Sequence, residues 1–198
     1  MPPRLTALRD LLSDHPTLDA TEQRHQQRIV DLCDRGIAGD LDPFARACFV
    51  PGHFTASSFV LGPSLDTVLL ILHAKLGFWM QPGGHIDPDD PDVLAAARRE
   101  VAEETGLEAL ELWPPKGQIG LLDMDIHPIP AHRSEPAHEH FDLRYLFRSA
   151  TTAIHENDET RGAQWVALQD FETVRSDASV MRAVTRIRHI LQDSAGRP

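Results

Sequence analysis

Cysteine, long apolar runs and positive charge are all scarce in this sequence, and each scarcity excludes a class of protein. The two cysteines among 198 residues argue against a disulfide framework and favour a reducing cytoplasm. The longest apolar run, 67–72, is too short to span a membrane, and the N-terminus lacks the apolar stretch of a secretory signal. The formal charge of −11 argues against nonspecific nucleic-acid binding, which requires basic patches. We therefore expect a cytoplasmic protein with neither membrane nor nucleic-acid partners.

The same composition permits a globular enzyme that acts on a negatively charged substrate. Apolar residues make up 41% of the chain and charged residues 25%, which is ordinary for a protein that buries a core. A bound divalent cation reverses the local field of an acidic protein. The net charge is therefore compatible with a phosphorylated small molecule as the substrate.

The first part of the chain, 1–40, is predicted to form a helical extension. Apolar residues recur at helical spacing over 5–12 before the pattern breaks. A second helix is expected from a cap at Asp19 or Thr21 to Gly36. We interpret the pair as a docking hairpin without chemistry. A dimerisation arm, which would make the protein a homodimer, and a cover over the substrate site are the alternatives.

The main domain, 41–198, is predicted to be of mixed α+β class. Strands at 54–61 and 67–73 form a hairpin across Gly62-Pro63-Ser64, and a short strand covers 78–80. A helix is expected from about Pro91 to Thr105, with glycine just beyond its end. The later elements are strands at 117–126, 140–149 and 164–167 and a last helix at 178–192. This order lacks regular βαβ repetition.

The predicted helix 91–105 carries three glutamates on one face. At about 100° per residue, Glu100, Glu103 and Glu104 fall together. Three apolar residues on an adjoining face are expected to point into the core: Leu94, Ala97 and Val101. Like charges at these spacings each cost roughly a few tenths of a kcal/mol, and Arg99 offsets only part of that. A solvated acidic face is one interpretation; a site for Mg²⁺, with Mn²⁺ as a substitute, is the other.

Two glycines favour the metal interpretation. Gly83 and Gly84 follow the predicted strand 78–80 and lead into the loop before the helix. Because glycine lets a ligand approach the backbone closely, we expect Gly83 to line the substrate and the carbonyl of Gly84 to supply a metal ligand. A tight turn is the structural explanation of the same residues, and both can hold together.

The segment 84–107 resembles the Nudix box, G-x5-E-x7-R-E-U-x-E-E-x-G-U, in which U is a bulky aliphatic residue. Gly84 matches its first glycine. Seven residues match its second half: Arg99, Glu100, Val101, Glu103, Glu104, Gly106 and Leu107. Asp90 stands where the first glutamate is expected, and one extra residue separates it from Arg99. Both departures fall where insertions are best tolerated, so the metal-binding half is intact.

The resemblance implies the Nudix fold, a mixed β-sheet sandwiched between α-helices. It also implies hydrolysis of a diphosphate linkage in a nucleoside diphosphate derivative by metal-activated water. Carried over by position, Glu100 and Glu104 are metal ligands, Glu103 is a ligand or the general base, and Arg99 orients the glutamates. In a downstream loop, Glu159 has the spacing of the family's auxiliary glutamate and is our preferred base, with an ordinary polar loop as the alternative.

Other residues give weaker signals. We expect His85 to contact the substrate or metal-bound water, and Trp79 either to stack on a base or to belong to the core. Five histidines gather in the sequence: His127, His132, His138, His140 and His155. They predict a second metal site, phosphate contacts or, as we prefer, a half-exposed strand beside a proline-rich loop. On a strand, His138, His140 and Asp142 share one face.

Two other functions compete with hydrolysis. An isomerase of the same fold acting on isopentenyl diphosphate would require a catalytic cysteine and a histidine-rich metal site, and neither is evident around the box. A non-catalytic, ligand-binding Nudix-like regulator would be expected to have lost the acidic residues, but all three glutamates are present. We therefore favour the hydrolase.

Overall fold

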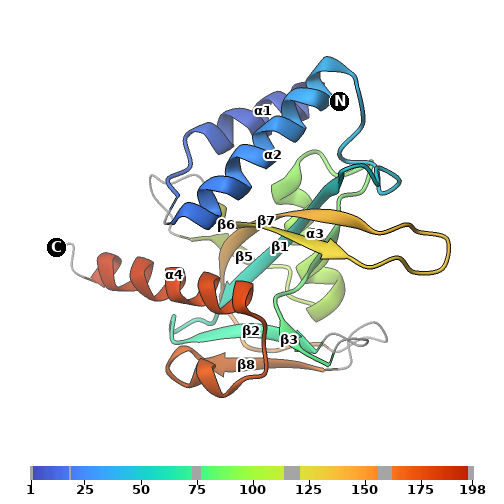
Figure 1. The fold of residues 1–198 in the computed structure, drawn as a ribbon. Helices are drawn as coiled ribbons and strands as arrows, with labels where there is room; N and C mark the ends of the chain where they lie inside the picture. The colour runs from blue at the N-terminus through green and yellow to red at the C-terminus, as the bar shows by residue number, and fades with distance from the viewer. Residues whose placement is uncertain (1, 18, 73–76, 114–120, 156–161, 196–198) are drawn as a thin grey trace. The chain divides into compact units, whose positions relative to one another are not determined.

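The computed structural model describes residues 2–17, 19–72, 77–113, 121–155 and 162–195 (Figure 1). Its elements follow in the order α1 (Pro2–Ser13), α2 (Ala20–Ala38), β1 (Gly52–Leu61), β2 (Thr67–Leu72), β3 (Trp79–Met80), β4 (Gly83–His85), α3 (Val93–Thr105), β5 (Leu110–Leu112), β6 (Leu121–Ile129), β7 (His138–Ser149), β8 (Ala163–Ala167), the 3₁₀-helix η1 (Leu168–Thr173) and α4 (Ala178–Ala195). Within these ranges no helix is both long enough and apolar enough to cross a membrane.

The strands pair into one eight-stranded sheet. Neighbours follow the order β3-β2-β1-β7-β5, with β4 paired to β1, β6 to β7 and β8 to β2. The predicted hairpin is confirmed, because β1 and β2 are antiparallel with Leu61 opposite Val68. On its other side β2 runs antiparallel to β8, in a register that places Leu69 opposite Trp165.

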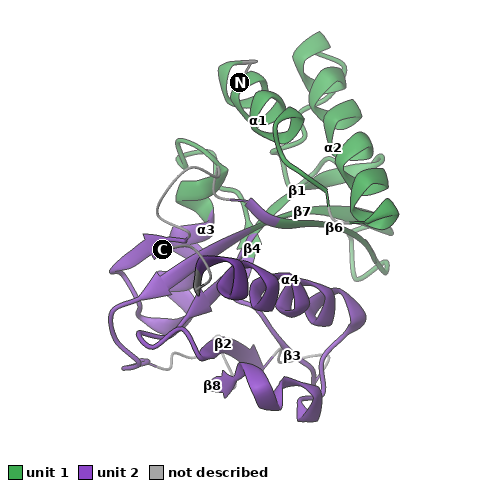
Figure 2. Ribbon diagram, turned by 90° about the vertical axis from the view of Figure 1, so that its left-hand side faces the viewer, with its two compact units in different colours: residues 1–56, 84–96, 123–144 green, residues 57–83, 97–122, 145–198 purple. Residues whose placement is uncertain are grey.

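The chain divides into two compact units, coloured separately in Figure 2. One comprises residues 1–56, 84–96 and 123–144, and the other residues 57–83, 97–122 and 145–198. The elements β1, β4, α3, β6 and β7 each contribute residues to both units.

The first unit contains the helix pair α1 and α2. Asp19 caps α2 as predicted, since its carboxylate accepts hydrogen bonds of 2.7 and 2.9 Å from main-chain N–H groups of the first turn. The predicted end at Gly36 is wrong: Gly39, at φ 87°, is the left-handed cap. Gly36 lies inside the helix, where a Cβ atom would come within 2.7 Å of the Leu5 side chain. Its role is therefore close packing between the two helices.

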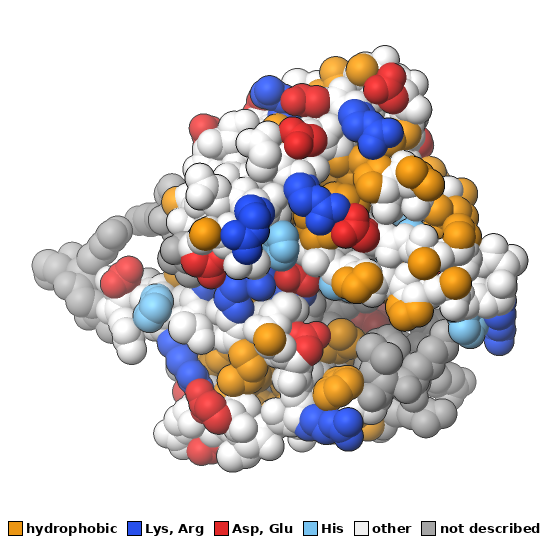
Figure 3. All heavy atoms as spheres, in the orientation of Figure 1, with side chains coloured by type: hydrophobic (Ala, Val, Ile, Leu, Met, Phe, Trp, Pro, Cys, Tyr) orange, Lys and Arg blue, Asp and Glu red, His pale blue; other side chains and the backbone are white. Residues whose placement is uncertain are grey.

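Aromatic rings form the core of this unit beside the helices. Phe54 on β1 has its ring centroid 5.5 Å from that of Phe44 and 6.4 Å from that of Phe141, both in edge-to-face geometry. Acidic and basic side chains are interspersed over α1 and α2, in the upper part of Figure 3. One such pair joins the two helices, with Arg9 Nε 2.6 Å from Asp34 Oδ1.

The second unit is held together by the apolar face of α4. The helix begins at Ala178, as predicted, because the Asp177 carboxylate accepts the N–H groups of Ser179 and Val180 at 2.8 and 2.9 Å. Its buried residues join one cluster with β1, β2 and β8, made up of Phe59, Leu61, Val68, Leu70, Leu122, Leu146, Val166, Leu168, Phe171, Val180, Ala183, Val184 and Ile187. This cluster supplies the hydrophobic stabilisation that fixes the surrounding strands.

Several predicted boundaries differ from the observed ones. The helix expected from Pro91 begins at Val93, because the Asp92 carboxylate accepts the N–H of Ala95 at 2.8 Å and so caps the first turn. The strand expected at 117–126 is described from Leu121 to Ile129, and its first four predicted residues lie outside the described residues. The elements β4, β5 and η1 were not predicted.

Candidate functional site

The acidic helix α3 is positioned by apolar residues on its opposite side. Val93, Ala96, Ala97 and Val101 are buried, whereas Leu94, which was expected in the core, is only half-buried. Gly106 ends the helix in a left-handed conformation at φ 73°, as the sequence predicted. With this side buried, the glutamates lie on the remaining face of the helix.

Arg99 holds two of the three glutamates. Its Nη1 donates to Oε1 of Glu100 at 2.9 Å and to Oε2 of Glu103 at 2.8 Å. The Glu100 side chain is 14% exposed and that of Glu103 53% exposed. One guanidinium thus bridges two carboxylates.

Glu104 is held by the backbone. Its Oε2 accepts the main-chain N–H of Gly83 at 2.9 Å. The segment before Gly83 is itself anchored, because the carbonyl of Pro82 accepts the N–H of Ser58 at 2.9 Å. The glycine loop and the acidic helix are thus joined by a hydrogen bond that no motif in the sequence reveals.

The donor set on α3 fits a hard divalent cation. Glu100, Glu103 and Glu104 offer carboxylate oxygens, and Arg99 compensates only part of their negative charge. Gly84 and His85 of β4, also predicted at the site, belong to the first unit, whereas these glutamates belong to the second.

Asp90 has a local role in the loop. One of its carboxylate oxygens accepts the N–H of Asp87 at 2.8 Å, and its own N–H donates to the carbonyl of Asp87 at 3.1 Å. The residue is 8% exposed. The carboxylate at the position of the family's first glutamate therefore closes a turn.

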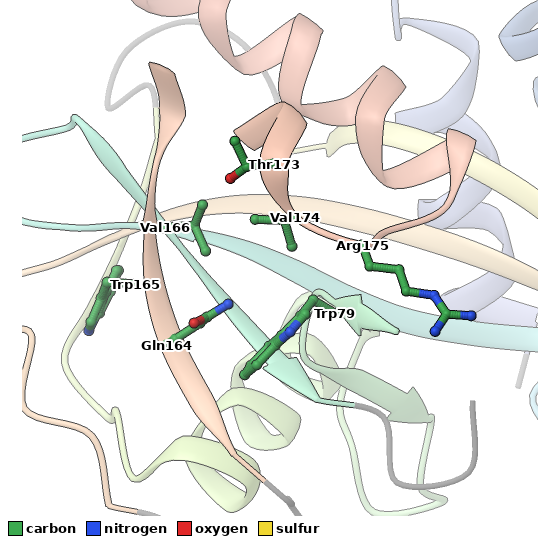
Figure 4. Close-up of a pocket in the computed structure, with 7 residues that line it drawn as sticks. All are labelled: Trp79, Gln164, Trp165, Val166, Thr173, Val174 and Arg175. Atoms are coloured by element: carbon green, nitrogen blue, oxygen red, sulfur yellow. The ribbon is translucent and has the colours of Figure 1, made fainter. Parts of the chain in front are cut away.

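A cavity of about 370 Å³ lies in the second unit next to Trp79. Its lining residues are Trp79, Gln164, Trp165, Val166, Thr173, Val174 and Arg175 (Figure 4). The backbone of Trp79 is clamped on both sides, since its N–H donates to the carbonyl of Arg175 at 3.0 Å and its carbonyl accepts the Ser176 hydroxyl at 2.8 Å. In Figure 4 the side chains of Trp79 and Gln164 lie next to each other, and the Arg175 guanidinium extends away from them.

The histidines divide between the two units. His127, His138 and His140 lie in the first unit with their rings in contact, at centroid distances of 5.5 Å for His127–His140 and 5.3 Å for His138–His140. His132 is exposed in a turn, and His155 belongs to the second unit, next to Gly106. The predicted strand through His138 and His140 is confirmed as part of β7.

Two further histidines, which no local pattern in the sequence connects with the others, join the first group. His53 on β1 lies 5.0 Å from His138 and 4.8 Å from His140, measured between ring centroids. His85 on β4 lies 5.1 Å from His53 and 5.3 Å from His140. Burial, together with the charge of Arg46, lowers the pKa of His85 to about 4, and burial among neighbouring imidazoles lowers that of His140 to about 2.

Beside the histidines, β6 and β7 carry a buried charge network. Arg144, only 2% exposed, contacts Asp123 at 3.1 Å, Asp125 at 3.3 Å and Asp142 at 2.9 Å. His127 hydrogen-bonds Asp125 at 3.2 Å. Burial opposes protonation of His127, but this hydrogen bond and the nearby aspartate charges outweigh it and raise its pKa. The face shared by His138, His140 and Asp142 is thus largely enclosed.

The remaining predicted catalytic residue cannot be placed. Glu159, with its neighbours Glu156 and Asp158, lies outside the described residues.

The chain belongs to the NUDIX domain family, whose sequence profile matches residues 52–186. Solved structures share the fold. A NUDIX-family hydrolase from Clostridium perfringens is 24% identical, with a TM-score of 0.56 over 70% of this chain and 97% of that one. An Ap4A hydrolase from C. elegans is 16% identical, with a TM-score of 0.52 over 71% and 98%. The NUDIX domain of Shewanella oneidensis NrtR, complexed with ADP ribose, is 17% identical, with a TM-score of 0.51 over 80% and 98%. The predicted family and fold class are therefore confirmed.

Proposed function

We propose that this chain hydrolyses a diphosphate linkage in a nucleoside diphosphate derivative, with Mg²⁺ as its cofactor and Mn²⁺ as a substitute. The observation that carries the proposal is the acidic face of α3, where Glu100, Glu103 and Glu104 are held in place within the family's motif by Arg99 and by a backbone N–H. A purely structural helix gains nothing from three like charges at these spacings.

Each box residue has a distinct proposed task. Glu100 and Glu104 are the ligands that hold the cation, with the carbonyl of Gly84 as a further oxygen. When bound, Mg²⁺ neutralises diphosphate oxygens and acidifies a water molecule. Arg99 acts as a positioning residue, since its hydrogen bonds of 2.9 and 2.8 Å fix the carboxylates of Glu100 and Glu103. The N–H of Gly83 does the same for Glu104.

A carboxylate must also take the proton from the attacking water. A carboxylate engaged with a cation is a weakened base, because the cation favours its ionised form. We therefore propose Glu159 as the base, with Glu103 as the alternative. Glu103 is the more exposed of the two glutamates bound by Arg99, at 53% against 14% for Glu100, which leaves it accessible to solvent water.

The cavity beside Trp79 supports a nucleoside as one part of the substrate. Trp79 is four residues from Gly83, so their Cα atoms are at most about 14 Å apart, and Gly83 is bonded to Glu104. An indole beside the amide of Gln164 offers a stacking surface and hydrogen bonds to a base. Ap4A and ADP ribose, named for two similar structures, both carry an adenosine on a phosphate chain.

The isomerase alternative is less well supported. It required a histidine-rich metal site, for which His53, His85 and His140 are candidates, and also a catalytic cysteine. Burial and the charge of Asp34 raise the pKa of the buried Cys33 thiol to about 12. Burial also raises the pKa of Cys48. Both are free thiols, which agrees with the cytoplasm as the proposed compartment. The boundary between an extension 1–40 and a main domain 41–198, and a homodimer formed through that extension, remain predictions.

The test is a panel of diphosphate compounds incubated with the full-length protein and Mg²⁺, with products separated by anion exchange. The panel includes ADP ribose, a sugar nucleotide, a dinucleoside polyphosphate and a nucleoside triphosphate. We expect at least one compound to be cleaved at a phosphorus–oxygen–phosphorus linkage, with loss of turnover in excess chelator and recovery on adding Mg²⁺ or Mn²⁺. Undiminished turnover in chelator, or cleavage of no member by folded, Mg²⁺-loaded protein, would reject the proposal.

A further inference from the structure

Three imidazoles from distant parts of the sequence converge in the first unit. His53 comes from β1, His85 from β4 and His140 from β7. One ring nitrogen of each lies within 4.8 Å of those of the other two. None of the three belongs to the carboxylate set on α3, although His85 directly follows Gly84, a proposed Mg²⁺ ligand.

The hydrogen bonding of His53 points to a missing partner. Its Nδ1 lies 3.2 Å from the carbonyl oxygen of Cys48, which places the proton on Nδ1 and the lone pair on Nε2. His53 is 1% exposed, and among the described residues its buried Nε2 has no hydrogen-bond partner. A buried polar atom without a partner costs roughly 1–3 kcal/mol. A backbone carbonyl on one ring nitrogen with the other left open is the arrangement commonly found for metal-bound histidines.

As neutral imidazoles, the three rings each carry a lone pair that a metal ion can bind. Arg46 and Glu135, whose charges act on His85 in opposite directions, pair with each other at 3.0 Å. His138 stacks on His53 at an interplanar angle of 28°, and its Nδ1 lies 2.8 Å from the carbonyl oxygen of Pro136.

We propose that His53, His85 and His140 bind one divalent transition-metal ion, with Zn²⁺ as the best match. Imidazole nitrogen suits zinc and its first-row neighbours, whereas Mg²⁺ prefers oxygen. Two nitrogens bound to one tetrahedral Zn²⁺ at about 2.0–2.1 Å are about 3.3 Å apart. The observed upper limit is 4.8 Å, so a bound ion would draw the three nitrogens closer together. Three protein ligands leave a fourth position open to water or to a small anion.

The test measures Zn²⁺ binding to the full-length chain after removal of metal by chelator. Isothermal titration gives the affinity and stoichiometry, and Co²⁺ absorption in the visible range reports ligand geometry. We expect one Zn²⁺ per chain at the histidine site. His140→Asn and His53→Gln should each weaken binding by more than the roughly 10–100-fold typical of losing an outer partner. His189→Asn, on the exposed side of α4, is the matched control and should leave binding unchanged.

Two further variants separate this site from the hydrolytic centre. Glu100→Gln and Glu104→Gln should retain the high-affinity Zn²⁺ site and its Co²⁺ spectrum. The proposal is overturned if wild-type protein binds Zn²⁺ no more tightly than His140→Asn does, with both folded by circular dichroism. It is equally overturned if binding disappears in Glu104→Gln but persists in both histidine variants. If a histidine variant fails to fold, the Co²⁺ spectrum of the wild type decides between nitrogen and all-oxygen ligands.

Discussion

The main-chain N–H of Gly83 donates a 2.9 Å hydrogen bond to the carboxylate of Glu104. Gly83 of β4 and the last acidic residue of α3 are 21 positions apart in the sequence, and this bond joins the strand to the helix. A charge-assisted hydrogen bond from the backbone fixes a carboxylate better than solvent does. It also offsets part of the penalty of an anion in the last turn of a helix.

Replacing Glu104 by glutamine removes the charge of the side chain but keeps its size and shape. The amide oxygen of Glu104→Gln can still accept the Gly83 N–H, so we expect the metal-free protein to keep its melting temperature or to gain slightly from reduced repulsion. Turnover should fall by more than about 100-fold, because a metal ligand is lost. Steady-state assays and thermal melts measure the two effects.

The control for this prediction is Glu108→Gln, an exposed residue just beyond the box. It removes the same charge and should leave both turnover and melting temperature within error. A large drop in the melting temperature of metal-free Glu104→Gln would mark the carboxylate as structural instead.

Glu159 gives a second prediction about the chemistry. As the proposed general base it does not hold the cation, so Glu159→Gln should lower kcat by roughly two to four orders of magnitude while metal affinity changes little. Single-turnover kinetics together with Mn²⁺ titration provide both values. If Glu159→Gln retains normal kcat and Glu103→Gln loses it with metal still bound, the base lies on α3.

Substituting the glycine that ends α3 should cost more stability than substituting the glycine that ends α2. Gly106 and Gly39 both have positive φ, at 73° and 87°, and a Cβ atom in that region costs roughly 1–2 kcal/mol. At Gly39 no atom of the described residues lies within 4 Å of the added atom, whereas at Gly106 it would meet the Cβ of His155 at 2.9 Å. Gly106→Ala should therefore destabilise more than Gly39→Ala, by roughly a further 1–3 kcal/mol. Urea unfolding of both variants checks this, and equal losses would contradict it.

Thiol reactivity should distinguish the two cysteines. The pKa of Cys33 is raised to about 12 by burial and then by the charge of Asp34, so almost no thiolate exists near neutral pH. Cys48 is half-buried, and burial raises its pKa as well. In native protein we expect iodoacetamide to modify Cys48 slowly and Cys33 not at all, and both to react in urea. Mass spectrometry of the digested protein measures this, and rapid native labelling of Cys33 would refute the assigned burial.

Local signals explain what could be predicted from sequence. Asp19 before an apolar-periodic run, and Gly62-Pro63-Ser64 between two β-branched segments, act over a few residues, so the helix start and the hairpin were correctly placed. Gly36 was misassigned because glycine has two uses, capping and close packing, and only the position of Leu5 decides between them. The strands β4 and β5 have three residues each, too few to show a period.

The histidine cluster could be predicted only in part, because its members come together through strand pairing over long separations in the chain. His138 and His140 were recognised as neighbours because two residues on one strand share a face. His53 and His85 reach the same place only through strand pairing over long separations in the chain. The available signal was a histidine near the start of β1, a strand that is buried throughout, where a polar ring requires a partner.

The cavity beside β8 also has an optical consequence. The chain contains three tryptophans, and two of them, Trp79 and Trp165, line that cavity, whereas Trp113 does not. Indole fluorescence responds to the polarity around the ring, so a ligand that displaces water there changes the emission of those two fluorophores. Ligand binding can therefore be followed by tryptophan fluorescence without an added label. A Trp79→Phe variant would show which of the two rings gives the change in emission.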